Sequence, residues 1–195
     1  MIAEMRPSPR KPTLLDGMLL VGATAIGLAG YRARRSFQRL PGIWWGLDVH
    51  QGAVWLAVSL SLAVLAIRLR PPRPLRRRLA CQPGTAATVA AACTLALVLL
   101  ERLEGYLFTL LKGFGSRPLD VQIIEDVGNT MTVCAGPAVA AAWTVLIVGR
   151  RWRPERSWID RLGIALGLYW LLHGSISWLA SALPDLLRWL GTALR

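Results

Sequence analysis

The sequence has few charged residues and few cysteines, and each scarcity excludes a class of protein. Only 17% of the 195 residues are charged, whereas soluble domains average about 25%. The three cysteines, Cys81, Cys93 and Cys134, are scattered and form no CxxC pair, which argues against a disulfide framework or a zinc site. Nucleotide-binding, metalloprotease and serine-hydrolase motifs are missing from the sequence. We therefore expect no cofactor, no bound metal ion and no soluble-enzyme activity.

Acidic residues are also few, since 11 aspartates and glutamates stand against 23 lysines and arginines. A chain this basic is often a nucleic-acid-binding protein. Here, however, the arginines lie between long apolar runs instead of along one soluble face, and 54% of the residues are hydrophobic. We therefore expect a membrane protein whose basic residues meet anionic lipids, with no nucleic acid as a partner.

Long apolar runs make up most of what remains. A bilayer core about 30 Å thick requires about 20 residues of helix, and five runs are near that length: 14–31, 49–67, 79–100, 127–149 and 162–184. Such runs predict an all-α, polytopic transmembrane helix bundle that forms a single integral membrane domain, residues 1–195. A shorter apolar stretch predicts an interfacial helix near 103–114. For the first run, a surface-lying segment or a cleaved signal peptide are the alternatives.

The basic residues also predict an orientation. With five spans, the amino terminus and the second and fourth connections share a side and carry 14 lysines and arginines, against nine on the other side. The positive-inside rule then predicts a multi-pass protein of the cell inner membrane with a cytoplasmic amino terminus. The arginines that we expect to contact lipid headgroups are Arg73, Arg76, Arg77, Arg78, Arg150, Arg151 and Arg153.

The first run begins with Thr13 and Asp16, three residues apart and just after Pro12. This spacing is typical of a capping box, in which each side chain accepts a hydrogen bond from the other residue's backbone N–H. The same segment, TLLDGMLLVGATAIGLAGYRARR (residues 13–35), resembles the amino-terminal segment of uncharacterised multi-pass membrane proteins from planctomycete-type, high-GC genomes. The resemblance implies membrane insertion and no particular activity.

Other acidic and imidazole groups lie near the predicted membrane surfaces. Asp48 and His50 stand two residues apart, so they do not face each other on a helix, and we expect them to mark a helix start. The third connection, from Glu101 to Asp126, is the most acidic segment. It lacks the EF-hand spacing, so we expect a solvated acidic loop instead of a cation site.

His173 is the deepest ionisable residue, midway along the run 162–184. Tyr169, Ser177 and Ser181 stand at −4, +4 and +8 from it, so the four residues form a polar stripe on one helix face. Either hydrogen bonds to polar groups of neighbouring spans satisfy His173, or it has a functional role such as proton transfer. A haem between His173 and His50 is not expected, because the two histidines differ in depth by about 15 Å.

Small residues recur in the predicted spans and favour close association of helices in lipid. Examples are Ala23 with Gly27, the alanines between residues 86 and 92, and the GxxxG pair Gly163 and Gly167. The sequence therefore favours a non-enzymatic structural or accessory subunit that packs on another membrane protein or forms a homo-oligomer. The alternative is a small transporter or channel that uses the stripe around His173, and a membrane enzyme is the least favoured class.

Overall fold

The computed structural model describes residues 12–37, 45–70, 81–111 and 119–193. Within these ranges the chain forms helices joined by short connections and contains no β-strand, which confirms the all-α prediction. The helices are α1 (Leu14–Phe37), α2 (Trp45–Leu69), α4 (Pro83–Leu111), α5 (Leu119–Val148) and α6 (Trp158–Ala193). Each of the five contains a stretch long and apolar enough to cross a membrane.

Most helix boundaries differ from those of the predicted runs, and two of the differences change an expected element or move a charged residue into a helix. The stretch near 103–114 was expected to form a separate interfacial helix, but it extends α4 without a break as far as Leu111. No proline interrupts it, and the one internal glycine, Gly105, is tolerated within a helix. Helix α6 begins at Trp158, four residues before the predicted span, so it includes Asp160 in its first turn. The observed helix α6 therefore contains charged residues that the predicted apolar run excluded.

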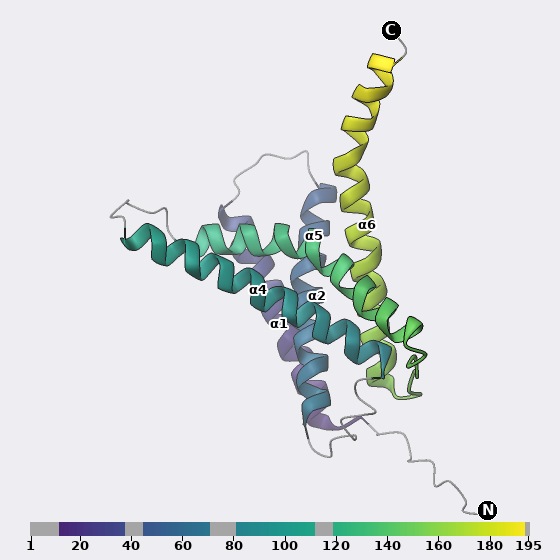
Figure 1. The fold of residues 1–195 in the computed structure, drawn as a ribbon. Coiled ribbons are helices and arrows are strands. Elements are labelled where there is room, and N and C mark those ends of the chain that lie inside the picture. Colours follow the sequence, from purple (N-terminus) through teal and green to yellow (C-terminus); the bar gives the residue numbers. More distant parts are fainter. Residues whose placement is uncertain (1–11, 38–44, 71–80, 112–118, 194–195) are drawn as a thin grey trace, which may run out of the picture.

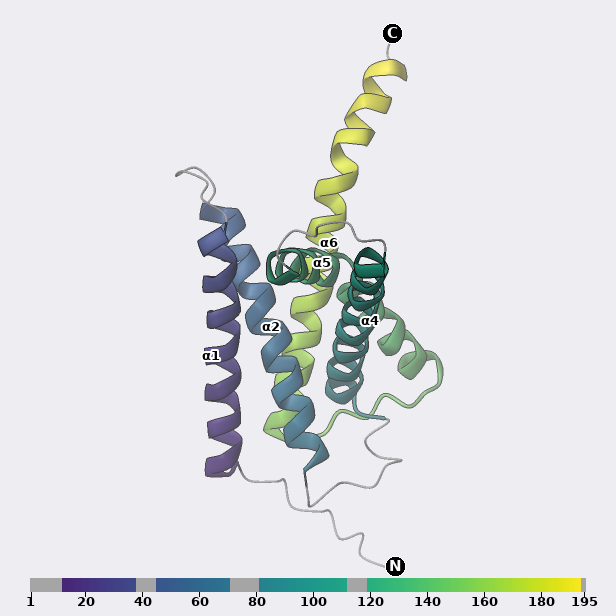
Figure 2. The same cartoon turned by 90° about the vertical axis from the view of Figure 1, so that its left-hand side faces the viewer.

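The helices form two groups with different directions. Figures 1 and 2 show α1, α2 and α6 running roughly alongside one another, while the α4–α5 hairpin crosses them obliquely and extends to one side. Helices α4 and α5 have 29 and 30 residues, which corresponds to about 44 Å of helix. Because a bilayer core is about 30 Å thick, a strong tilt is one way to accommodate helices of this length.

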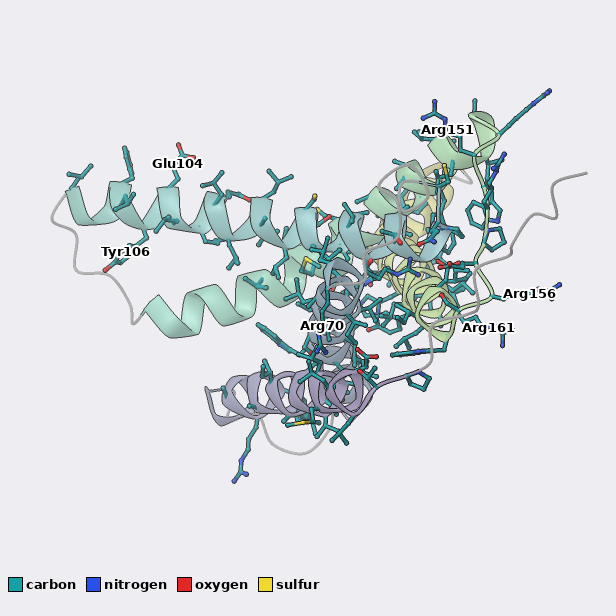
Figure 3. All side chains as sticks on the ribbon, turned by 90° about the horizontal axis from the view of Figure 1, so that it is seen from below. Arg70, Glu104, Tyr106, Arg151, Arg156 and Arg161 are labelled. Carbon is teal, nitrogen blue, oxygen red and sulfur yellow. The ribbon has the colours of Figure 1, made fainter. Side chains whose placement is uncertain are left out.

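One end of the bundle collects the starts of α1, α4 and α6 and the ends of α2 and α5 (Figure 1). Five helices of alternating direction predict this arrangement, in which the end of α2 and the segment between α5 and α6 lie on the same side as the start of α1. We call this side the basic end, because six exposed arginines lie there, several of them labelled in Figure 3. They are Arg70, Arg150, Arg151, Arg153, Arg156 and Arg161.

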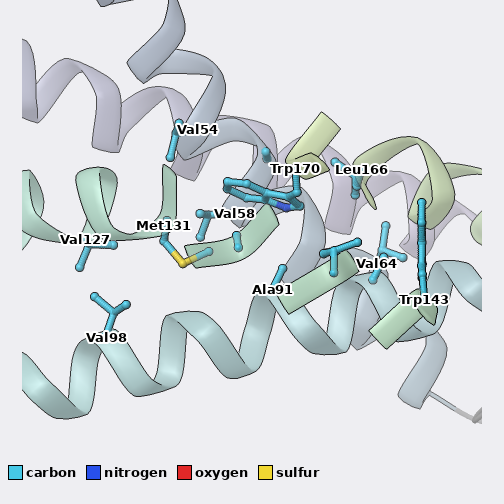
Figure 4. Close-up of a cluster of buried hydrophobic side chains, with 14 of the residues drawn as sticks. Val54, Val58, Val64, Ala91, Val98, Val127, Met131, Trp143, Leu166 and Trp170 are labelled. Carbon is cyan, nitrogen blue, oxygen red and sulfur yellow. The ribbon is translucent and has the colours of Figure 1, made fainter. Parts of the chain in front are cut away.

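A buried core lies where α2, α4, α5 and α6 meet. Trp170 of α6 has no exposed surface, and Figure 4 shows it among side chains of the other three helices. Val58, Ala91 and Met131 represent α2, α4 and α5 in this cluster. In lipid the gain from this packing is mainly van der Waals contact, since lipid tails are as apolar as the core.

The carboxyl end of α5 determines how the arginine-containing connection leaves the bundle. The N–H of Arg151 donates to the carbonyl of Leu146 (2.8 Å), and the N–H of Arg150 donates to that of Ile147 (3.0 Å). This pair of bonds is a Schellman motif, which requires a left-handed residue at the position of Arg150. Arg150 has φ of 51° there, although glycine is the residue that adopts this conformation without strain. The motif turns the chain sharply into the segment before α6.

Candidate functional site

The first polar cluster is built on the start of α6. Ser157 precedes the helix and its hydroxyl accepts a hydrogen bond from the N–H of Asp160 (3.3 Å). This is the first half of a capping box, and negative charge is favourable in a first helical turn. The Asp160 side chain has no exposed surface. A buried carboxylate needs hydrogen-bond donors and a counter-charge, and both come from other helices.

The carboxylate of Asp160 receives donors from three segments. Its Oδ1 accepts from the guanidinium Nη2 of Arg68 in α2 (2.8 Å) and from the N–H of Gly84 at the start of α4 (3.1 Å). Its Oδ2 accepts from the N–H of Glu155 (2.8 Å). Arg68 is only 4% exposed, so the two charges form a buried ion pair. We call Arg68, Gln82, Thr85 and Asp160 the Arg68 clasp.

The remaining donors of Arg68 are directed at α4. Its Nη1 donates to Gln82 Oε1 and to Thr85 Oγ1, and the Thr85 hydroxyl donates in turn to Gln82 Oε1 (3.1 Å). The amide of Gln82 then donates to the carboxylate of the exposed Glu155 (2.8 Å). Removing one partner of a buried ion pair typically costs about 3–5 kcal/mol, because the other charge stays buried. The clasp therefore joins α2, α4 and α6 at the basic end.

Glycine allows α4 and α6 to approach closely enough for this geometry. A Cβ added at Gly163 would lie 2.6 Å from the carbonyl oxygen of Gly84, so the two backbones are in direct contact. One turn further along α6, a Cβ at Gly167 would lie 2.5 Å from the ring of Trp143 and 2.8 Å from Ala87. The predicted close packing at Gly163 and Gly167 is thus observed, and it occurs within the chain.

The second polar cluster surrounds His173, which is 5% exposed. Its Nε2 lies 3.2 Å from Thr132 Oγ1 in α5, and its Nδ1 lies 3.4 Å from the hydroxyl of Tyr169. Thr132 donates its own proton to the carbonyl of Gly128 (2.8 Å). We assign the neutral Nε2–H tautomer from this network, since Thr132 must then accept from Nε2 and Tyr169 can donate to Nδ1. The imidazole is thereby hydrogen-bonded at both nitrogens.

Trp170 links the His173 cluster to α2. Its ring lies edge-on to His173, with centroids 6.2 Å apart, and its Nε1–H donates to Ser61 of α2 (3.3 Å). Ser61 donates to the carbonyl of Ala57 in its own helix (2.6 Å). Close contact with α5 is also present here, because a Cβ at Gly136 would lie 2.7 Å from the carbonyl oxygen of Trp170.

The predicted polar stripe is only partly assembled. Tyr169 and His173 are stacked, with centroids 5.2 Å apart. Ser177 is half-buried, and the exposed Ser181 donates to the carbonyl of Trp178 in its own helix (2.8 Å). The contacts of His173 thus run along the stripe to Tyr169 and sideways to Thr132 of α5. A functional role for these four residues stays a prediction.

The predicted headgroup contacts divide into two sets. Arg150, Arg151 and Arg153 are exposed at the basic end, and the N–H of Arg153 donates to the carbonyl of Cys81 (3.0 Å). The other four, Arg73, Arg76, Arg77 and Arg78, lie outside the described residues. Arg68 directly follows the predicted second span, 49–67, and was included among the 14 basic residues of the amino-terminal side. It is instead a buried residue of α2, because its counter-charge lies on another helix, where a hydropathy count cannot detect it.

The capping box at α1 is confirmed. The N–H of Thr13 donates to Asp16 Oδ2 (2.9 Å), and the N–H of Asp16 donates to Thr13 Oγ1 (3.3 Å). Asp48 and His50 lie in the first turns of α2, and their side chains are outside the described set. Over the described ranges, no group of three or more histidine, cysteine or acidic residues is placed to hold a metal ion.

The Arg68 clasp was not predicted from the sequence, although one signal for it was present. Residues 157–160, Ser-Trp-Ile-Asp, repeat the pattern of residues 13–16, Thr-Leu-Leu-Asp. The pattern marks a helix start, and it would have moved Asp160 into the last span. Comparison with protein-family models, curated proteins and solved structures found no match for this chain.

Proposed function

We propose that this chain is a structural or accessory subunit of the cell inner membrane, with a cytoplasmic amino terminus, that packs on another membrane protein or on itself. The observation that supports this most is the surface of α1. Only 17% of its membrane-spanning stretch is buried, against 33–44% for the other four helices. The other four helices are thus covered about twice as much within the chain as α1, most of which is available for lipid or for a partner.

The exposed side of α1 carries small residues at helix-packing spacing. Met18, Gly22, Ala25 and Ala29 are exposed and lie on one face, which we call the outer face of α1. A Cβ added at Gly22 would meet nothing within 4 Å. The opposite face packs on α2, where a Cβ at Gly27 would lie 2.6 Å from Ser59 Oγ. Because small residues let helices approach closely in lipid, the outer face is suited to a second helix.

Gentle solubilisation followed by native mass spectrometry tests this proposal. We expect a homo-oligomer or a stoichiometric partner with the natural chain, and a loss of that species with Gly22→Ile. Gly17→Ile is the matched control, because Gly17 is also on α1 with open space around it, but lies off the outer face. A clean monomer from the natural chain, or equal behaviour of the two variants, would contradict the proposal.

The basic end supports anionic lipids as a further partner. Six exposed arginines lie there, and each is worth about 1 kcal/mol near an anionic leaflet. We expect the chain to retain anionic phospholipid when it is purified from a mixture with zwitterionic lipid, as measured by lipid mass spectrometry. Replacing Arg150, Arg151 and Arg153 with glutamine should reduce that retention. The exposed Arg32, on the other side of the bundle, supplies the control Arg32→Gln.

A transporter or channel is the second candidate, and the linked hydrogen bonds of Tyr169, His173 and Thr132 favour it. Such a chain of groups can pass a proton between two helices. In that case, proton flux into liposomes that contain the protein should stop with His173→Ala and fall with Thr132→Val. Flux equal to that of empty liposomes would remove this candidate and leave the subunit role.

A further inference from the structure

Helix α2 joins two packing units, the α1–α2 pair and the group formed by α4, α5 and α6. Helix α1 packs mainly on α2, while the three helices of the group pack extensively on one another and also on α2. Figure 2 shows α1 on the far side of α2 from α4 and α6. The main contact between the units is therefore one face of α2, which we call the α2 seam.

The α2 seam consists mostly of small and medium-sized apolar side chains. Its buried residues recur at helical spacing: Val54, Ala57, Val58, Ser61, Val64, Ile67 and Arg68. Helix association in lipid lacks the hydrophobic driving force that operates in water and depends on close packing and polar contacts. Apart from Ile67, the apolar side chains of the seam are valine and alanine, which discriminate weakly between alignments that differ by one helical turn, because similar side chains then exchange places.

Polar contacts cross the seam at two positions of α2. Ser61 accepts a hydrogen bond from Trp170 at 3.3 Å, and Arg68 pairs with Asp160 at 2.8 Å. The two positions are seven residues apart, which places them on the same face about 10 Å apart along the helix. A slide of one turn, about 5 Å, would separate Arg68 from Asp160 and leave both charges buried without each other.

We propose that the Arg68 clasp fixes the axial alignment of the α1–α2 pair against α4, α5 and α6, while the apolar seam supplies their affinity. Buried polar groups specify a single alignment in other helix assemblies, and replacing a buried ion pair with uncharged groups can leave stability unchanged. The clasp is also tied to the surface, because Glu155 binds both Asp160 and Gln82. The connection between α5 and α6, which carries exposed arginines, is therefore held in place by the same hydrogen bonds that keep α2 aligned with α4 and α6.

The test is a distance measurement in lipid bilayers. Spin labels at the exposed Val21 of α1 and Ile176 of α6, in a chain whose three cysteines are replaced by alanine, report the alignment by double electron–electron resonance. The natural pair should give one narrow distribution. Arg68→Met combined with Asp160→Asn removes both charges but keeps an acceptor for Gly84. We expect it to broaden the distribution or add a population displaced by about one turn, about 5 Å.

Ser61→Ala is the matched control, since it removes the weaker polar contact and should leave a single distribution. An unchanged distribution in the double variant overturns the proposal, even if thermal unfolding shows a large loss of stability. If the double variant does not fold, Arg68→Lys is measured instead, because it keeps the charge but lacks the planar group that binds Asp160, Gln82 and Thr85 together. A distribution like that of the natural chain in Arg68→Lys then overturns the proposal.

Discussion

Helices α1 and α6 begin with the same local pattern but use it differently. At α1, Thr13 and Asp16 cap each other reciprocally. At α6, Ser157 caps the N–H of Asp160, but the carboxylate of Asp160 turns away and binds Arg68, Gly84 and Glu155. A capping pattern thus locates a helix start, while the groups that reach its carboxylate decide whether the start also joins distant helices.

The strongest test of this difference removes each carboxylate in turn. Asp160→Ala should lower the free energy of unfolding by about 3–5 kcal/mol, because Arg68 then remains buried without its counter-charge. Asp16→Ala should cost less, and its cap to Thr13 accounts for about 1 kcal/mol of that loss. Unfolding by titration with a denaturing detergent in mixed micelles measures both. Equal losses would show that Asp160 acts only as a cap.

A double-mutant cycle separates the ion pair from the rest of the clasp. Arg68→Met and Asp160→Ala should each be costly, and the double variant should lose less than the sum of the two. The coupling is expected to be about 1–3 kcal/mol, since the residues are in direct contact. The pair Ser181 and Arg68 serves as an uncoupled comparison, because Ser181 lies 21 residues after Asp160 in α6, about 30 Å further along the helix, and bonds within its own helix. Additive losses for Arg68 and Asp160 would contradict the paired geometry.

Replacing a glycine near each of the two helix starts with alanine should change stability in opposite directions. Gly163→Ala should cost about 1–3 kcal/mol by overpacking, because its Cβ would lie 2.6 Å from the backbone oxygen of Gly84. Gly17→Ala should instead stabilise α1 by about 0.5–1 kcal/mol, because nothing lies within 4 Å of its Cβ position. The same unfolding titration reports both values, and a gain in stability with Gly163→Ala would contradict the close crossing of α4 and α6.

The capping hydroxyls of Thr13 and Ser157 should contribute similar amounts to the free energy of unfolding. Thr13→Ala and Ser157→Ala each remove one cap to the N–H of an aspartate, so each is expected to cost about 1 kcal/mol. Ser157 also donates weakly to Glu155 (3.3 Å), which predicts a slightly larger loss for Ser157→Ala. If Ser157→Ala cost several kcal/mol more than Thr13→Ala, the hydroxyl would belong to the clasp and not to the cap.

Features that depend on neighbouring residues were predictable. The apolar runs coincide with the five helices, because burial of the backbone in lipid requires helices of that length. The cap at Asp16 and the close approach at Gly163 and Gly167 followed from spacing alone. The separate interfacial helix was wrong, because a short apolar stretch after a span has no local stop signal and continues the preceding helix.

Features that depend on distant residues were not predictable from one sequence. Hydrogen bonding was the favoured interpretation of His173, but its partner Thr132 was one of several polar residues offered by the neighbouring spans. Arg68 resembled the arginines that follow it in the chain, and nothing in its own neighbourhood distinguishes a buried arginine from one that meets lipid. The predicted last span begins at residue 162, so Asp160 fell outside it by only two residues.

Sequence by itself determined that this chain is helical, apolar enough for a membrane and basic at one end, because hydropathy, capping and charge act over a few residues. Only the tertiary structure decided which charges are partners. Asp160 lies 92 residues from Arg68 and 76 from Gly84, and these groups meet because glycine lets α4 and α6 touch while α2 ends beside them. Two carboxylates at equivalent places in the same motif thereby differ in what they are seen to hold: Asp16 caps the start of its own helix, and Asp160 joins three helices.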